Sequence, residues 1–167
     1  MAVPNRRPTV LVIDDEPLVR RVARRALEPD LYVLEAADGE DGLVLLDQHQ
    51  AAIDLVVTDF MMPKISGLQV IAVLAEHRPE LPVIGMTGHA DLALRGAAAT
   101  FGVRVLQKPF EIGALIASVQ EVLAESRDGR SVSGRKRGGV GENALGTSTA
   151  SLVAAAEKFT PLMKSLR

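Results

Sequence analysis

Four apolar runs in this chain each end at a polar residue that phosphate chemistry can use, and this repeated arrangement constrains the fold most. The residues at the ends are Asp14 with Asp15, then Asp59, Thr87 and Lys108. If the runs are parallel strands of one sheet, their carboxyl ends lie along the same edge, where open α/β sheets bind ligands. We therefore expect carboxylates, one hydroxyl and one ammonium to share a pocket.

Apolar runs alternate five times with helical patterns, which is typical of βαβ units and a parallel sheet. The second and fifth runs are the most polar, which places them at the edges of the sheet. The prediction is a flavodoxin-like, doubly wound sheet of five parallel strands in the order 2-1-3-4-5, with five helices. The strands are expected over residues 9–13, 31–36, 53–58, 81–86 and 103–107.

Several helix ends carry residues with suitable chemistry. Pro17 suits a first helical turn, Asp38 and Ser66 can cap the helices that follow them, and Gly102 suits a left-handed end. The fifth helix is expected from residue 112, where apolar residues recur at offsets of three and four.

Charge divides the 167 residues into two regions. Residues 1–125 hold 11 Lys and Arg against 18 Asp and Glu, a net charge of −7, whereas residues 126–167 hold 8 against 3, a net charge of +5. We expect one domain over residues 1–125, a flexible basic Gly/Ser/Arg linker over 126–147, and a short amphipathic helical tail over 148–167.

The tail has an apolar stripe but no defined partner. Pro161 either kinks the tail helix or begins a second helix capped by Thr160. The helix can dock on the main domain, pair with another copy or bind a partner groove, and the sequence does not choose among these. The stripe consists of Leu152, Ala156, Phe159, Met163 and Leu166.

Composition limits the location and the chemistry. The chain has no Cys, which excludes disulfides, thiolate nucleophiles and Cys-based metal sites. Its apolar runs are too short for a signal-peptide core or a membrane span, so we expect a soluble, cytoplasmic protein with no membrane partner.

Carboxylates that crowd together repel one another, and a cation relieves this repulsion. Oxygen ligands with room for water and phosphate favour Mg²⁺. The ammonium of Lys108 and the hydroxyl of Thr87 would then contact a phosphoryl group, and a carboxylate would be the nucleophile. Taken singly, each residue has an ordinary alternative as a turn, cap or solvated surface residue.

Five separated motifs, in order, make residues 8–125 resemble the receiver domain of two-component response regulators. They are Val12-Ile13-Asp14-Asp15-Glu16, Thr58-Asp59-Phe60-Met61-Met62-Pro63, Gly67, Met86-Thr87-Gly88-His89-Ala90 and Gln107-Lys108-Pro109-Phe110. The resemblance implies a phosphorylation-dependent switch of a two-component or phosphorelay system, not an enzyme.

The resemblance also implies roles for individual residues. Asp59 would accept a phosphoryl group from a sensor histidine kinase or a histidine phosphotransfer protein. Asp15, Asp59 and the Met61 backbone carbonyl would bind Mg²⁺ directly, and Asp14 would bind it mostly through water. Lys108 and Thr87 would contact the phosphoryl group.

The resemblance places the output surface on the fourth helix, fifth strand and fifth helix, roughly residues 90–124, where a downstream protein or a second copy would bind. The chain departs from the family at Val105, where an aromatic residue that moves together with the threonine is common.

Three alternative functions share parts of this pattern. A transcriptional regulator would use the basic tail to contact DNA, but about 20 residues cannot form a DNA-reading domain, so nucleic acid is not an expected partner. An aspartate-nucleophile phosphohydrolase of the haloacid-dehalogenase type would need a second Asp two positions after Asp14, where Glu16 stands. A degenerate receiver would work unphosphorylated, yet none of the chemical residues is missing.

Overall fold

The computed structural model describes residues 6–88, 92–128 and 148–165. Five strands and seven helices are formed by these residues. The strands are β1 (Thr9–Ile13), β2 (Tyr32–Ala36), β3 (Ile53–Asp59), β4 (Val83–Thr87) and β5 (Arg104–Gln107). The helices are α1 (Pro17–Leu27), α2 (Gly39–Gln48), α3 (Gly67–His77), α4 (Leu92–Thr100), α5 (Ile112–Arg127), α6 (Thr149–Lys158) and α7 (Thr160–Ser165).

All five strands form one parallel sheet in the order β2-β1-β3-β4-β5, which confirms the predicted topology. The central strands β1, β3 and β4 are almost wholly buried, whereas the edge strands β2 and β5 are partly exposed. This distribution explains why the second and fifth runs are the more polar ones.

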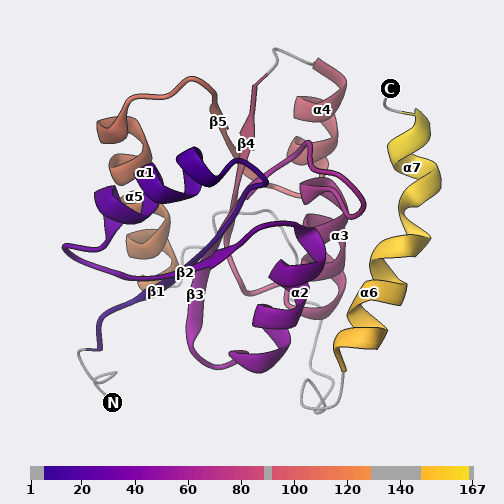
Figure 1. The fold of residues 1–167 in the computed structure, drawn as a ribbon, viewed down its shortest axis with the longest axis horizontal. Coiled ribbons are helices and arrows are strands. Elements are labelled where there is room, and N and C mark those ends of the chain that lie inside the picture. Colours follow the sequence, from indigo (N-terminus) through magenta and orange to yellow (C-terminus); the bar gives the residue numbers. More distant parts are fainter. Residues whose placement is uncertain (1–5, 89–91, 129–147, 166–167) are drawn as a thin grey trace.

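Helices cover both faces of the sheet (Figure 1). Helices α1 and α5 lie together on one face, above a core that includes Val12, Val57 and Leu115. Helices α2, α3 and α4 lie on the other face, above a core that includes Ile13 and Phe60.

Local chemistry sets several of the element ends. The Asp38 carboxylate accepts a hydrogen bond from the Asp41 amide at 2.9 Å, and Ser66 forms a capping box with Gln69, so both predicted caps are present. Gly102 follows α4 with a φ of 64°, which is the left-handed conformation predicted for this helix end.

The tail forms two helices, α6 and α7, with Phe159 between them. Of the two alternatives for Pro161, the structure has the second helix, which begins at Thr160 itself. The pair lies outside α2 and α3 as an additional layer (Figure 1). Helix α5 continues to Arg127, two residues beyond the boundary expected after residue 125. Residues 129–147 of the expected linker lie outside the described residues, as do Leu166 and the Met163 side chain.

Within the described ranges, no helix is both long and apolar enough to cross a membrane.

Candidate functional site

The carboxyl ends of β1 and β3 bring two aspartates together at one edge of the sheet. Asp14 directly follows β1, and Asp59 is the last residue of β3. Ile13 is paired with Thr58 in the parallel register, so Asp14 and Asp59 leave neighbouring strands at the same level. Both residues are buried, with relative exposures of 0% for Asp14 and 6% for Asp59.

One lysine bridges these two carboxylates. Lys108 follows β5, and its Nζ lies 2.7 Å from Asp14 Oδ2 and 2.7 Å from Asp59 Oδ2. The Lys108 amide donates to the Thr87 carbonyl at 2.7 Å, which ties the end of β5 to the end of β4. The Lys108–Pro109 peptide is cis. Residues from three strand ends therefore meet at one ammonium, as the sequence predicts.

Burial and ion pairing oppose each other at this cluster. Burial raises the pKa of Asp14, and the hydrogen bond and charge of Lys108 only partly offset this effect. Burial alone would lower the pKa of Lys108, but its hydrogen bonds to Asp14 and Asp59 outweigh burial and raise the pKa above 10.5. The pKa values of Asp14 and Lys108 are therefore both raised. Lys108 gains from two carboxylates, whereas Asp14 shares a single ammonium with Asp59.

A third carboxylate completes an all-oxygen cluster. One carboxylate oxygen from each of Asp14, Asp15 and Asp59 lies within 4.8 Å of the others. Asp15 is exposed, which gives the cluster a side open to solvent. Oxygen donors at this spacing, with access for water, fit a hard divalent cation such as Mg²⁺.

Two further predicted residues border the cluster. The Met61 amide donates to Asp59 Oδ1 at 2.9 Å, and the Met61 side chain is 45% exposed. Thr87 is buried at the end of β4, one residue beyond Met86, which is paired with Asp59. His89 and Ala90, part of the same motif, lie outside the described residues.

Residues 10–120 match the sequence profile of the response regulator receiver domain. The chain belongs to this family. A receiver domain protein from Clostridium thermocellum has the same fold, with a TM-score of 0.68 and 31% identity over 72% of this chain and 97% of that chain. The expected resemblance and the flavodoxin-like fold are therefore confirmed.

Curated relatives are longer proteins. The chain is 39% identical to the C4-dicarboxylate transport transcriptional regulatory protein DctD of Pseudomonas aeruginosa, over 71% of this chain and 26% of that protein. It is 34% identical to the sensor kinase CckA of Brucella abortus, over 69% of this chain and 12% of that protein. The chain thus spans about a quarter or less of the length of these two relatives.

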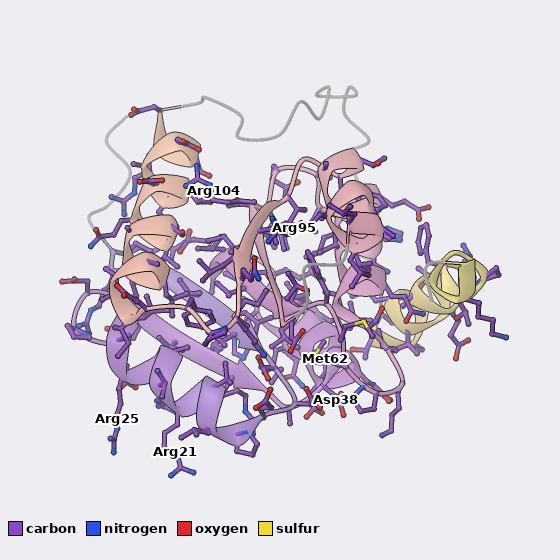
Figure 2. The ribbon with its side chains drawn as sticks, turned by 90° about the horizontal axis from the view of Figure 1, so that it is seen from above. Arg21, Arg25, Asp38, Met62, Arg95 and Arg104 are labelled. Atoms are coloured by element: carbon purple, nitrogen blue, oxygen red, sulfur yellow. The ribbon has the colours of Figure 1, made fainter. Side chains whose placement is uncertain are left out.

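Two residues beside the receiver site were missed by sequence reasoning. Glu16 Oε1 lies 3.6 Å from Lys108 Nζ, and Arg20 Nη1 donates to the Asp14 carbonyl at 2.6 Å. Arg20 could have been found, because helical side chains point toward the helix N-terminus and α1 begins next to Asp14. Arg21 and Arg25, in contrast, point from α1 into solvent (Figure 2).

Val105 stands at the position where receivers commonly carry an aromatic residue, and it packs against the core. Val105 on β5 is half-buried against the core on the α2–α4 side of the sheet. Beside it, Arg95 of α4 donates to Gln107 of β5 at 2.5 Å.

Proposed function

We propose that this receiver is a phosphorylation-dependent switch in which Asp59 accepts a phosphoryl group from a phosphohistidine on a sensor kinase or phosphotransfer protein. The observation that carries the proposal is the Lys108 ammonium, which lies 2.7 Å from Asp59 and from Asp14. An ammonium at this position offsets charge on a phosphoryl group transferred to the Asp59 carboxylate.

In the proposed reaction, one oxygen of Asp59 attacks phosphorus, the phosphorus–nitrogen bond of the donor breaks, and the imidazole leaves with the electron pair. Lys108 holds the acceptor oxygen and its new phosphoryl oxygens, and Thr87 donates its hydroxyl to one of these oxygens. Asp14, Asp15, Asp59 and the Met61 carbonyl would hold Mg²⁺, which when bound neutralises charge on the phosphoryl oxygens.

The α4–β5–α5 surface is the proposed output face, where a downstream protein or a second copy would bind. Arg104 of β5 (Figure 2) pairs with Glu121 and Glu125 of α5, and Leu92 of α4 is 83% exposed. This face thus offers a partner both an apolar side chain and paired charges. The described part of the tail, residues 148–165, supports this proposal because its main contacts are with α2 and α3 rather than with α4, β5 or α5.

Acetyl phosphate tests the proposal without a cognate kinase. The full chain, incubated with acetyl phosphate and Mg²⁺, should gain the mass of one phosphate, and Asp59→Asn should gain none. Asp41→Asn, which alters an exposed aspartate in the first turn of α2, is the matched control and should be modified like the wild type. Equal modification of Asp59→Asn and the wild type, or no modification of the wild type, would refute the assignment.

A further inference from the structure

Helix α6 packs on the α2–α3 side of the receiver as a buried element. Leu152, Ala155 and Ala156 of α6 are each 8% exposed or less. They belong to the same apolar cluster as Met62 and Ile65, which lie in the loop that follows Asp59. The tail therefore shares a core with the loop nearest to the proposed phosphoryl acceptor.

Polar contacts hold α6 at both ends. At its first residue, the amide and the hydroxyl of Thr149 donate to Asp47 Oδ2 on α2, at 3.0 and 2.7 Å. Near its last turn, Gln69 Nε2 of α3 donates to the Ala156 carbonyl at 3.0 Å and to Thr160 Oγ1 at 3.2 Å. The Ala156 carbonyl also accepts from the Phe159 amide at 3.1 Å, so Gln69 adds a second hydrogen bond to this carbonyl from another element.

The same Gln69 side chain caps α3. Its Oε1 accepts hydrogen bonds from the Ser66 amide at 3.0 Å and from the Ser66 hydroxyl at 3.1 Å. Gln69 is 5% exposed and Ser66 is 7% exposed, so a lost bond would leave a buried polar group unsatisfied. One buried amide thus joins the start of α3 to the end of α6.

The start of α3 also touches the backbone of Asp59. The Gly67 amide donates to the Phe60 carbonyl at 3.2 Å, and a Cβ added to Gly67 would lie 1.8 Å from the Asp59 carbonyl oxygen. The Met61 amide bonds to the Asp59 carboxylate. The loop over residues 60–66 is therefore fixed by Asp59 at one end and by Ser66, Gln69 and α6 at the other.

We propose that the α2–α3 face is a helix-binding surface whose ligand is residues 149–165 of this chain, and that its occupation and phosphoryl capture at Asp59 favour each other. The inference rests on the proposed function of Asp59. Docking of α6 orders the loop that carries the Met61 amide and carbonyl. A site that is already ordered loses less conformational entropy when Mg²⁺ and a phosphoryl group bind.

Linkage makes the effect reciprocal. If docked α6 strengthens binding at Asp59, binding at Asp59 must strengthen the docking of α6 by the same factor. The proposed partner is the chain's own tail, since both anchors, Asp47 with Thr149 and Gln69 with Ala156, are formed within one molecule.

Two alanines on α6 provide a matched test. Ala156 is fully buried, whereas Ala154 is exposed, so Ala156→Asp places a charge in the interface and Ala154→Asp places the same charge in solvent. Hydrogen exchange of the α6 amides, measured by mass spectrometry on the full chain, reports docking. Beryllofluoride with Mg²⁺, titrated by NMR, serves as the phosphoryl probe.

In the wild type, the probe should slow α6 exchange by about fivefold. Ala156→Asp should speed α6 exchange and raise the half-saturating probe concentration by about fivefold, and Ala154→Asp should match the wild type. If Ala156→Asp unfolds the receiver, Asp47→Ala, which removes the Thr149 anchor and a hydrogen bond from Gln50 but adds no buried charge, should change both readouts in the same direction by a smaller factor.

The possible failures are distinguishable. If Ala156→Asp releases α6 but binds the beryllofluoride probe as tightly as the wild type does, the coupling is overturned and the proposed function stays intact. Protection of α6 that grows with protein concentration would show that the tail occupies a second copy, which would overturn the intramolecular ligand. A wild type that does not bind the probe at all would refute the function of Asp59 itself.

Discussion

Lys108→Met removes the ammonium that two buried carboxylates share. The Lys108 side chain is 13% exposed, and within residues 6–88, 92–128 and 148–165 it is the only cation paired with Asp14 or Asp59. Breaking a buried ion pair from one side typically costs about 3–5 kcal/mol, because the remaining charge stays buried without a partner. Two carboxylates lose their partner, and one of them can take up a proton instead. We therefore expect the free energy of unfolding to fall by about 3 kcal/mol at pH 7.

For a chain of 167 residues this loss corresponds to a lower unfolding temperature by about 6–12 °C. Thermal unfolding followed by circular dichroism, in EDTA at pH 7, measures it. Lys158→Met, on the exposed side of α6, is the matched control and should stay within about 1 °C of the wild type.

Two conditions should reduce the loss of stability in Lys108→Met, and both follow from the missing ammonium. Mg²⁺ should stabilise this variant more than the wild type, because the ion replaces the missing positive charge between Asp14, Asp15 and Asp59. Lowering the pH should also help, since the pKa of Asp14 is already raised by burial and rises further without the ammonium. A deficit that neither Mg²⁺ nor acid changes, or a variant as stable as Lys158→Met, would refute the reasoning.

Two other predictions concern the same edge of the sheet. In urea titrations, Gly67→Ala should lower the free energy of unfolding by roughly 2–3 kcal/mol, because its Cβ meets the Asp59 backbone. Gly113→Ala, whose Cβ meets nothing within 4 Å, should raise the free energy of unfolding by about 0.5–1 kcal/mol, and equal effects of the two substitutions would contradict the close approach at Gly67. The ion pairs of Lys108 contribute stability that is complete below pH 10.5 and is lost as the pH rises through the raised folded-state pKa, so the wild type should lose more stability than Lys108→Met between about pH 10 and pH 12. A parallel loss in both proteins would show that Lys108 is not the titrating group.

The fold was predictable because its signals are local. Each strand is an apolar run of a few residues, and the observed bounds differ from the expected ones by two residues or fewer at each end. Asp38 and Ser66 cap helices through their own amide neighbours, and Gly102 ends a helix through its own φ. Such features depend on the nearest few residues, which the sequence displays directly.

The site was predictable for a topological reason. Once the strand order is 2-1-3-4-5, the residues after β1 and β3 must be neighbours, and the cluster of Asp14 with Asp59 follows from the order alone. Lys108 leaves β5, two strands away from β3, and the length of its side chain closes that gap. The contacts of Glu16 and Arg20 depend on side-chain direction at the start of α1, and were found only in the structure.

The docking of the tail could not be read from the sequence, because an apolar stripe specifies burial but not the partner. Gln69 shows the difference most clearly. Its bond to Ser66, three residues away, follows from the capping-box pattern, whereas its bond to Ala156 spans 87 residues and depends on how α6 packs against α3. Once apolar packing has set the position of α6, the buried Gln69 Nε2 group needs a hydrogen-bond acceptor, and the Ala156 carbonyl near the end of α6 supplies one. The polar contact is therefore a consequence of the packing, and substitutions that disturb the packing of Ala156 should break it without altering Gln69.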